Sequence, residues 1–531
     1  MKCDTQLEGR DGAQFRRIDY LLLAAMAAAA CASLAWSTSG RGLGVSPDST
    51  VYLHAAESLA QGQGLTTYSP QGLTIPLTHY PPLLPAAIAL LSLCGLDSLD
   101  AARWLNVVAY GLSAPLLGVL LYRATRNRWA ALCGQALWMT SLPIVTAHSM
   151  AWSEPGFTLL GWVSLAAMAA HLCRPRRLWL LAAGLAAGLA FLDRYAGGAL
   201  LLTGAVALVR FSKERRRTRI AETAIFSALA CAGMLAWLVR NHFVAGGNLT
   251  NRQFAFHPPA FWQISVLAQT LWEWMPVPPA MQPVSLGLLA AAILAALWWM
   301  SRSRPQSEPS QASPSKLPHI LGIYILAYLA FMLATQFFFD AAVKLDDRSL
   351  APIWGGMIFL VVLLACRMVR LWKPGMARNA LVAAACLAMV GVGSQRAYQY
   401  LAAAHDQGLG FRSLAWEHSP LIEQVRKLPP QTRIYSNKID AVLFLTGRRA
   451  AELPPRFDEV THRPIEEYPA NMARMLETLR TSGGVIACFD GVTWGSPPDK
   501  ADLARRPLRA AAVCGDGVLF RFEPEANSTA K

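Results

Sequence analysis

The stretch ARWLNVVAYGLSAPLLGVLLY (102–122), followed by RATRNR (123–128) and WAALCGQALWMTSLPIVTA (129–147), places two long apolar runs on either side of a short basic loop. A bilayer core about 30 Å thick is crossed by roughly 20 helical residues, so each run is long enough to span a membrane. Over the whole chain, 54% of the residues are hydrophobic and 15% are charged. This composition predicts a polytopic α-helical membrane protein rather than a soluble enzyme.

Nine further apolar runs flank this stretch on both sides. Read as helices, they bring the predicted number of transmembrane helices to about eleven. The predicted spans are 18–37, 102–122, 129–147, 155–173, 178–193, 195–211, 220–239, 283–301, 318–339, 349–369 and 379–400.

Positive charge alternates along the loops between these spans. The segments on the side of the N-terminus hold 23 Lys and Arg residues, whereas the loops between spans on the other side hold six. Cytoplasmic loops are enriched in Lys and Arg. We therefore expect a multi-pass protein of the inner (plasma) membrane with a cytoplasmic N-terminus, and the odd number of spans then puts the C-terminal region outside. Because topology explains much of the net charge of +15, no nucleic-acid partner is expected.

The N-terminal run allows a second interpretation, because Arg16-Arg17 before an apolar stretch is also typical of a cleaved signal peptide. Its length of about 17 residues exceeds that of most such signals and favours a retained anchor. Ser301–Lys316 (SRSRPQSEPSQASPSK) is polar and predicts a cytoplasmic linker. Only Cys488 and Cys514 share the C-terminal region, where a disulfide and simple burial on neighbouring strands are both compatible with the sequence.

The longest loop between spans, at about 38–101, carries the first candidate catalytic residue. Its segment SPDSTVYLHAAESLAQGQGL (46–65) begins like a helix that starts at Ser46 or Pro47. Asp48 and Tyr52 then lie one turn apart on one face. An acid in the first turn also stabilises a helix through the dipole, so Asp48 is either a reactive carboxylate or a helix-stabilising one.

Two further motifs fall on the outer side. In THYPPLLPAAIALL (78–91), His79 and Tyr80 precede a double proline, which predicts an extended backbone and then a new helix. In SMAWSEPGF (149–157), Glu154 lies between Ser153 and Pro155 at the start of the fourth span, with Ser153 predicted as the helix cap. An ionisable residue at membrane depth is a functional candidate, and a capping acid is the alternative.

Residues 401–531 follow the last span and are predicted to form a small extracytoplasmic α/β domain. No phosphate-binding loop or dinucleotide fingerprint follows Gly483-Gly484, so we assign this domain to acceptor recognition or to support of the site. The expected strands are Ile434–Ser436, Val485–Phe489, Ala511–Val513 and Leu519–Phe522, and the expected helices are Ser419–Leu428, Lys438–Leu445 and Ile465–Leu479.

Taken in order, the outer motifs resemble those of the GT-C superfamily of polyprenyl-phosphate-sugar glycosyltransferases. The shared order is an Asp followed by Tyr, Ala, Leu and Gly-x-Gly, then H-x-P-P, then an acid before proline. The likeness is greatest to bacterial members related to protein O-mannosyltransferases and to the aminoarabinose transferase of lipid A. Further similar segments are FLDRYAGGALL (191–201), WLVRNHFVAGGNL (237–249), LDDRSLAPIW (345–354) and RIYSNKIDAVLFLTGRRAAELP (433–454).

This resemblance implies an activity and roles for individual residues. It implies a transmembrane catalytic domain at 1–400 that transfers a sugar from a polyprenyl-phosphate donor to an extracytoplasmic acceptor. Asp48 is implied as the base, and Glu154 as a residue that orients the acceptor or helps to bind a divalent cation. The residues implied in phosphate or substrate binding are Tyr52, His79, Tyr80, Arg194, Tyr195, Arg240, Asn241, Asp347 and Arg348.

The sequence departs from the family at 79–80, where related transferases carry Glu-Lys before the double proline. His79 would replace the lysine–phosphate contact either when protonated or through a neutral hydrogen bond. Each arginine also has a structural alternative: Arg240 snorkels at a span end, Arg194 pairs with Asp193 or anchors a tight turn, and Arg348 pairs with Asp346 or Asp347.

A transporter or flippase of lipid-linked envelope intermediates is the alternative function. Transporters usually place ionisable residues near the bilayer midplane. Here Asp48, Glu154, Asp193 and Asp347 fall at outer span ends and outer loops, which favours chemistry at the membrane surface. A scaffold that only displays the C-terminal domain would leave these acids unexplained, and the sequence names neither the sugar nor the acceptor.

Overall fold

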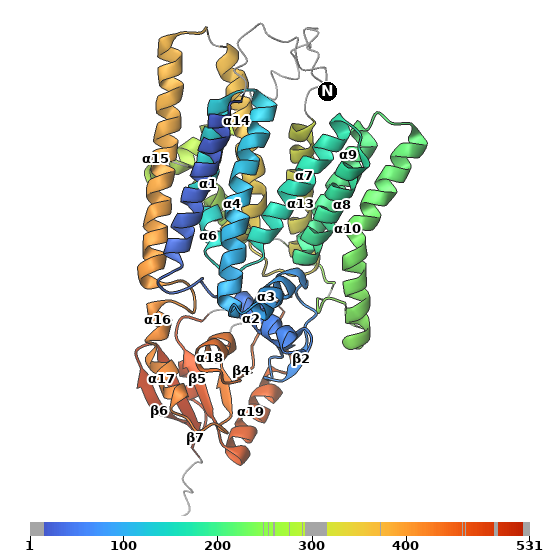
Figure 1. Cartoon of the computed structure of the whole chain (residues 1–531). Coiled ribbons are helices and arrows are strands. Elements are labelled where there is room, and N and C mark those ends of the chain that lie inside the picture. Colours follow the sequence, from blue (N-terminus) through green and yellow to red (C-terminus); the bar gives the residue numbers. More distant parts are fainter. Residues whose placement is uncertain are drawn as a thin grey trace, which may run out of the picture.

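The chain forms a long bundle of helices with a smaller region of helices and strands at one end (Figure 1). The computed structural model describes residues 15–247, 249–252, 254–258, 261–275, 277–288, 290–291, 316–371, 373–458, 460–461, 463–492 and 497–523.

The bundle is built from helices that coincide with most of the predicted apolar runs. They are α1 (Arg17–Ser37), α4 (Ser98–Thr125), α5 (Arg128–Met139), α6 (Leu142–His148), α7 (Glu154–Cys173), α8 (Arg177–Asp193), η1 (Tyr195–Gly197), α9 (Gly198–Phe211), α10 (Arg216–Val244), α13 (Leu317–Phe338), α14 (Asp347–Leu371) and α15 (Met376–Gln407).

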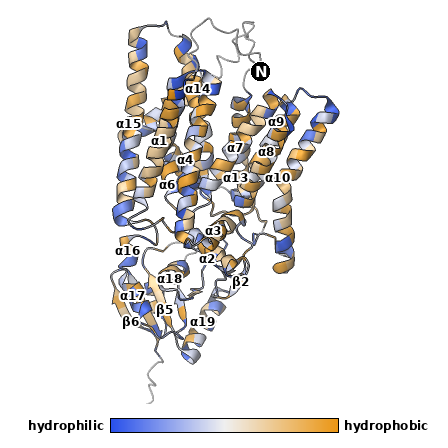
Figure 2. Cartoon of the chain, viewed as in Figure 1, coloured by the Kyte–Doolittle hydropathy of each residue, from blue (hydrophilic) through white to orange (hydrophobic). Residues whose placement is uncertain are grey.

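Seven of the described helices are long and apolar enough to cross a membrane, and the number is eight if the bent pair α5 and α6 is one span. Helices α8 and α9, with 17 and 14 residues, are shorter. Figure 2 shows that hydrophobic residues predominate along the bundle. The multi-pass membrane architecture is therefore confirmed. The predicted span at 283–301 lies mainly outside the described residues, as does the linker Ser301–Lys316, so the count of eleven stays a prediction.

The predicted span 129–147 is not one straight helix. Helix α5 ends at Met139 and α6 begins at Leu142, and the two axes differ in direction by 56°. Pro143 has no N–H to donate to the Met139 carbonyl four residues earlier, so the helical ladder breaks there. The Tyr110 hydroxyl donates a hydrogen bond to that carbonyl instead. After the bend, α6 leads into the short segment 149–153 before α7.

The turns of the bundle gather at two ends (Figure 1). The start of α1 and the turns that join α9 to α10 and α14 to α15 lie at one end, and α15 leads into the C-terminal region at the other. These two ends match the division of the loops by basic charge. Which end faces the cytoplasm stays a prediction.

The outer loop 38–101 folds into α2 (Pro47–Ala60), the hairpin β1 (Thr66–Tyr68) and β2 (Thr74–Pro76), and α3 (Leu83–Leu93). The expected helix start is confirmed, because Ser46 is the N-cap of α2 and Pro47 is its first residue. The new helix expected after the double proline is also present. Residues of α2 and α3 share one apolar cluster, so the loop has a core of its own.

The expected loop between α10 and α13 contains a further helix, α11 (Phe261–Glu273), and the short turn η2 (Pro279–Met281). Several aromatic residues fall in this segment. One of them, Trp274, is buried and packs on Trp354 with ring centroids 4.5 Å apart. Helix α11 forms one wall of a cavity, through Val266, Gln269, Thr270 and Glu273.

The C-terminal region contains a five-stranded mixed sheet in the order β4-β3-β5-β7-β6. Strand β3 pairs in parallel with β4 and β5, whereas β7 pairs antiparallel with β5 and β6. All seven expected strands and helices are confirmed within a few residues. The elements are α16 (Leu414–Glu417), α17 (Pro420–Arg426), β3 (Ile434–Ser436), α18 (Ile439–Thr446), β4 (Ala451–Glu452), α19 (Tyr468–Ser482), β5 (Val485–Phe489), α20 (Lys500–Ala504), β6 (Leu508–Cys514) and β7 (Gly517–Phe522).

Cys488 and Cys514 are both free thiols. The expectation that they lie on neighbouring strands is wrong, because β7 lies between β5 and β6. Their nearest partners across the sheet are Val518 for Cys488 and Gly517 for Cys514.

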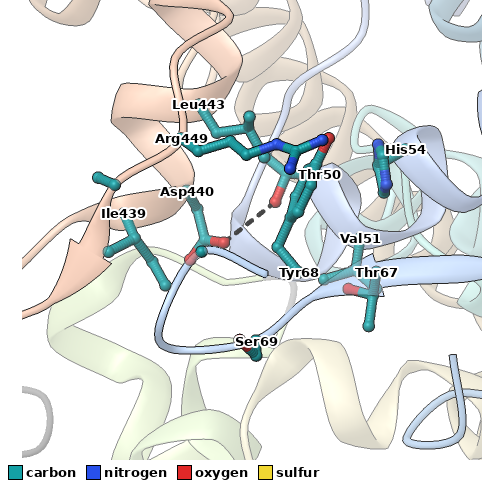
Figure 3. A pocket seen from close by; sticks show the side chains of 12 residues that line it. Thr50, Val51, His54, Thr67, Tyr68, Ser69, Ile439, Asp440, Leu443 and Arg449 are labelled. Carbon is teal, nitrogen blue, oxygen red and sulfur yellow. Dashed lines mark hydrogen bonds between the residues drawn. The ribbon is translucent and has the colours of Figure 1, made fainter. Parts of the chain in front are cut away.

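The outer loop is joined to the C-terminal sheet region through α2 and the hairpin (Figure 3). The Thr50 hydroxyl donates to Asp440 of α18 at 3.3 Å, and the Arg449 guanidinium lies 4.8 Å from the ring centre of Tyr68. The Glu452 N–H donates to the Pro70 carbonyl at 2.7 Å. The hollow between these groups has a volume of about 40 Å³, room for about one water molecule. We therefore interpret this region as a structural joint.

The orientation can be tested by cysteine labelling in right-side-out membrane vesicles. Ala470→Cys, at an exposed position of α19, is expected to react with a membrane-impermeant maleimide, because the C-terminal region lies opposite the basic turns. Lys213→Cys, exposed between α9 and α10, is the matched control and is expected to react only after lysis. The parent chain with its native cysteines supplies the baseline. Labelling in the reverse pattern would invert the proposed topology.

Candidate functional site

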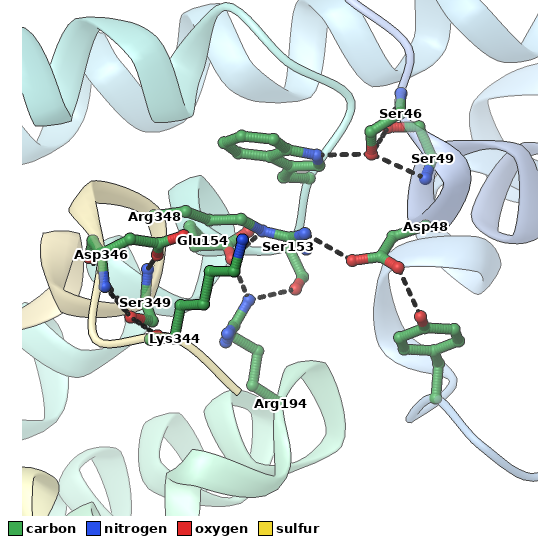
Figure 4. Close-up of polar contacts among 12 residues, drawn as sticks. Ser46, Asp48, Ser49, Ser153, Glu154, Arg194, Lys344, Asp346, Arg348 and Ser349 are labelled. Carbon is green, nitrogen blue, oxygen red and sulfur yellow. Dashed lines mark hydrogen bonds and ion pairs between the residues drawn. The ribbon is translucent and has the colours of Figure 1, made fainter. Parts of the chain in front are cut away.

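The helix α2 places Asp48 at the end of the bundle that adjoins the C-terminal region. The Ser46 hydroxyl accepts a hydrogen bond from the Ser49 N–H at 3.4 Å, and the Ser49 hydroxyl accepts from the Ser46 N–H at 3.0 Å. This capping box and Pro47 at the first position fix where the helix begins. Asp48 follows in the first turn, half-buried and facing the bundle (Figure 4).

The segment 149–153 carries Trp152 and leads to Glu154 at the start of α7. It is held by the backbone of Gly44, whose N–H donates to Ser149 at 2.9 Å and whose carbonyl accepts from Ala151 at 2.8 Å. A Cβ atom at this position would lie 2.7 Å from the Leu409 Cβ and 2.2 Å from the Met150 sulfur, so any other residue would force its neighbours to shift. The segment preceding α2 and the segment preceding Glu154 are thus fastened together.

Arg348, at the start of α14, joins the two candidate acids (Figure 4). Its Nε donates to Glu154 Oε1 at 2.7 Å, and its Nη1 forms an ion pair with Asp48 Oδ2. The planar guanidinium also stacks 4.3 Å from the ring centre of Trp152. The expected alternative, a pair between Arg348 and Asp346 or Asp347, is not the arrangement found.

A second arginine completes the network around Glu154, which is fully buried. Arg194 forms an ion pair with Glu154 Oε1 and donates to the Ser153 hydroxyl at 3.1 Å. Its partner is therefore Glu154, where the sequence suggested Asp193. Ser153 occupies the N-cap position, but its side chain does not cap α7, because its backbone is already helical (φ −84°, ψ −12°). Glu154 Oε2 has no hydrogen-bond partner in the described part of the chain.

The network controls the charge of Asp48. Burial by itself would raise the pKa of the Asp48 carboxyl, but the charge of Arg348 and the hydrogen bonds from Tyr80 and Arg348 outweigh burial and hold the pKa below its ordinary value. The Tyr80 hydroxyl donates to Asp48 Oδ1 at 2.5 Å. Tyr52 packs edge-on against Tyr80 with ring centroids 5.0 Å apart. Asp48 is therefore ionised at neutral pH.

His79 is neutral at the same pH. Burial and the charge of Arg252 lower the pKa of the His79 imidazole to about 4, although Asp48 acts in the opposite direction. Of the two possibilities that the sequence left open, the neutral hydrogen bond is thus favoured. Tyr80, which stands beside it, has its own hydrogen directed at Asp48.

Three predicted residues meet at a different place, on the backbone of the outer loop. Arg240 donates to the carbonyls of Leu77 at 2.5 Å and Leu65 at 3.2 Å. The Tyr195 hydroxyl donates to the Thr78 carbonyl at 3.1 Å, and Asn241 donates to Leu249 at 2.8 Å and, at 3.5 Å, to Thr78. The three arginines therefore do not converge in one cluster. A phosphate contact for Arg240 stays a prediction, whereas its observed role is to hold the segment before His79.

A cavity of about 390 Å³ opens beside Arg348. This volume lies within the range of small-molecule sites, roughly 300–1,000 Å³. Asp347 is on its wall and accepts a hydrogen bond from the indole N–H of Trp274 at 2.5 Å. The lining residues are Thr146, Trp152, Val266, Gln269, Thr270, Glu273, Lys344, Asp346, Asp347 and Arg348.

Two residues of the cavity wall, Trp152 and Lys344, were not predicted as site residues from the sequence. Trp152 precedes the Ser-Glu-Pro motif by one residue, and Lys344 lies four residues before Arg348, so both stood next to motifs that had been recognised. Figure 4 shows Lys344 and Arg348 reaching from the same chain segment toward Glu154. Lys344 adds a second cation to the cavity wall.

The candidate metal ligands do not form a metal site. Among the described residues, no group of three or more His, Cys, Asp and Glu side chains is placed to hold a metal ion. Asp48 and Glu154 both bond to Arg348, so a guanidinium takes the position of a bridging cation. The observed geometry suits an arginine-paired carboxylate site.

The overall fold is similar to those of three solved proteins, ArnT, AglB and AftD. Its structural neighbours include the aminoarabinose transferase ArnT from Cupriavidus metallidurans bound to undecaprenyl phosphate, with a TM-score of 0.56, 15% identity, and coverage of 94% of this chain and 97% of that chain.

Two further neighbours extend this likeness. The oligosaccharyltransferase AglB from Archaeoglobus fulgidus has a TM-score of 0.52 at 12% identity, covering 90% of this chain and 70% of that one. The mycobacterial arabinofuranosyltransferase AftD has a TM-score of 0.53 at 14% identity, covering 95% of this chain and 42% of that one. At these identities the likeness establishes the fold. No protein-family model and no curated protein matches the sequence.

The buried network predicts a large effect of neutralising Glu154. Glu154→Gln leaves Arg194 and Arg348 without their shared carboxylate, and breaking a buried pair typically costs about 3–5 kcal/mol. We expect a clearly lower midpoint of thermal unfolding in detergent. Glu423→Gln, in an exposed pair with Arg426, is the matched control, with an expected effect of about 0–1 kcal/mol.

The double variant Glu154→Gln/Arg194→Gln sharpens this test. Removing one of the uncompensated cations should recover part of the lost stability. Equal unfolding midpoints for Glu154→Gln and the unchanged protein would contradict the buried network.

Proposed function

We propose that the protein is a membrane glycosyltransferase that moves a sugar from a polyprenyl-phosphate donor to an acceptor hydroxyl on the extracytoplasmic side. The observation that carries this proposal is Arg348, which bonds to both Asp48 and Glu154 at the wall of a cavity of about 390 Å³. A carboxylate base and a cation beside a cavity are the groups that such a transfer requires. The GT-C fold supports the same assignment.

Asp48 acts as the general base in this proposal. Its carboxylate takes the proton of the acceptor hydroxyl, the acceptor oxygen forms a bond to the anomeric carbon, and the bond from that carbon to the phosphate oxygen breaks. The electron pair stays on the phosphate, which leaves as polyprenyl phosphate. Glu154 is fully buried, so in this proposal it orients the acceptor indirectly, by holding Arg348 through Oε1.

Arg348 and Lys344 bind the phosphate of the donor. Both line the cavity, and the leaving phosphate gains negative charge as the sugar departs, so the two cations bind it more tightly in the transition state. Lys344 then supplies the cation that the His79-Tyr80 departure removed. Arg194 keeps Glu154 in place rather than contacting the phosphate.

The remaining parts follow from this placement. We propose that residues 1–400 form the catalytic transmembrane domain and that residues 401–531, outside the cytoplasm, support the outer loop and help to receive the acceptor. The contacts of Thr50 with Asp440 and of Glu452 with Pro70 support this assignment. Membrane lipids surround the bundle, and the N-terminus is cytoplasmic.

The transporter alternative receives less support. The charged network lies at the ends of α2, α7 and α14 rather than at the middle of the helices, whereas transporters bind near the midplane. The discriminating experiment is chemical. The purified chain, incubated with a panel of polyprenyl-phosphate sugars and a membrane extract as acceptor, is expected to release polyprenyl phosphate. Movement of intact donor across vesicles without its cleavage would support the transporter instead.

Asp48→Asn is expected to abolish most of the turnover. The amide keeps the shape of the side chain but cannot take the acceptor proton, and loss of a general base typically costs about 10²–10⁴-fold. Glu57→Gln, which neutralises an exposed acid on the same helix, is the matched control and should leave turnover near normal. Release of polyprenyl phosphate from a labelled donor measures both. An Asp48→Asn enzyme of normal rate would make Asp48 a helix-stabilising acid only.

The pH dependence of turnover should change in Tyr80→Phe. The Tyr80 hydroxyl stabilises the charged form of Asp48 and so helps to hold the Asp48 pKa below its ordinary value. Activity that needs the carboxylate rises with pH through this pKa. Loss of the hydrogen bond raises the pKa and moves the acid limb of kcat/KM to higher pH, while the ring contact with Tyr52 is kept.

Tyr68→Phe is the control for this measurement. Tyr68 lies in the structural joint between α2 and α18, and its substitution should leave the acid limb unchanged. An acid limb that stays in place in Tyr80→Phe would separate Tyr80 from the titration of the base.

A further inference from the structure

Trp152 contacts both halves of the proposed site, although it is neither an acid nor a base. Its ring lies beneath the Arg348 guanidinium at 4.3 Å, and its indole N–H donates to the Ser46 hydroxyl at 2.8 Å. It also lines the cavity of about 390 Å³. Trp152 thus contacts Arg348, the proposed phosphate ligand. It also contacts Ser46, which caps the helix that carries Asp48.

We propose that Trp152 is a positioning residue that sets the plane of the phosphate-binding guanidinium and, through Ser46, the position of Asp48. The inference rests on the proposed transferase function and assigns within it a residue that neither takes a proton nor touches the acceptor oxygen. The stack on Arg348 affects phosphate binding, and the hydrogen bond to Ser46 affects the position of the base. Substitutions can therefore test the two contacts separately.

The stack of Arg348 on the Trp152 ring determines the direction in which the N–H groups not bonded to Glu154 or Asp48 point. Nε bonds to Glu154 and Nη1 to Asp48, and no hydrogen bond from Nη2 is found among the described residues. Arginine recognises phosphate through a planar fork, so the plane of the guanidinium decides whether that free edge meets the ligand. The Trp152 ring fixes this plane from one side, and the two carboxylates fix it from the edge.

The hydrogen bond to Ser46 determines where the base lies. The Ser46 hydroxyl caps α2, and Asp48 follows two residues later in the first turn. Because Gly44 also fastens the segment 149–151 to the chain before α2, Trp152 adds a side-chain bond to a backbone contact. Together they keep Asp48 at a fixed distance from Arg348 and from the neighbouring Glu154.

Two substitutions distinguish the contacts. Trp152→Phe keeps an aromatic ring under Arg348 and removes only the N–H donor, so we expect kcat to fall about 3- to 10-fold with the KM for the donor within 2-fold of normal. Trp152→Leu removes both contacts, and we expect the same loss in kcat together with a rise in donor KM of about 3- to 30-fold. If Trp152 had only a structural role, both variants would yield less folded protein. The folded fraction of each would then have normal kcat and KM.

A second pair of variants tests the hydrogen bond directly. In a Ser46→Ala background the acceptor of the indole N–H is absent, so Trp152→Phe should lower kcat no further. Trp129, stacked 4.9 Å from Arg128 at the opposite end of the bundle, is the matched control, and Trp129→Phe and Trp129→Leu should leave kcat and KM unchanged.

The outcomes separate this inference from the function on which it rests. Equal kinetic constants for the Phe, Leu and unchanged forms of residue 152, in a chain that releases polyprenyl phosphate, would overturn the positioning role alone. Additive losses in the Ser46→Ala background would overturn the proposed link to α2. A folded wild-type chain that cleaves no polyprenyl-phosphate sugar would overturn the transferase function, and the positioning role with it.

Discussion

A single guanidinium joins three segments at the end of the bundle that adjoins the C-terminal region. Arg348 bonds to Asp48 from the outer loop and to Glu154 from α7, so three segments far apart in the sequence meet at one charge. A buried carboxylate such as Glu154 is tolerated only when opposite charges compensate its lost hydration, and Arg194 supplies the second of them. Without these arginines, Glu154 could not stay charged in its buried position. The ion pairs also determine where Asp48 lies relative to Glu154.

The backbone makes this meeting possible before any charge is considered. Pro143 breaks the helix after Met139, and the resulting bend directs α6 into the segment 149–153. Gly44 then receives that segment at a distance that a side chain would prevent. The apolar helices form a packed support. The break between α5 and α6 turns the chain toward the site, and Gly44 lets the segment 149–151 lie against the chain before α2. The polar side chains at the site are thus positioned by elements that contain no reactive group.

The sequence predicted the helical membrane architecture and most of the charged residues at the candidate site, but not their pairing. Apolar length predicted most helices of the bundle, and turn residues predicted the start of α2. Arg194 and Arg348 were recognised as outer cations, yet their neighbours in sequence were offered as partners instead of Glu154 and Asp48. A cation at a span end can face a carbonyl or a carboxylate, and only the tertiary structure distinguishes them, as Arg240 on the Leu77 carbonyl illustrates.

In the proposed reaction, Arg348 lies between the base Asp48 and the donor phosphate, so it links proton transfer to departure of the phosphate. Before transfer, Asp48 is charged and competes with the donor phosphate for the guanidinium. When Asp48 takes the acceptor proton, it becomes neutral and loses most of its attraction for Arg348. In the same step the phosphate changes from a diester to a monoester and gains negative charge. Both changes shift the arginine toward the leaving group, so the proton transfer that activates the acceptor also strengthens the stabilisation of the departing phosphate.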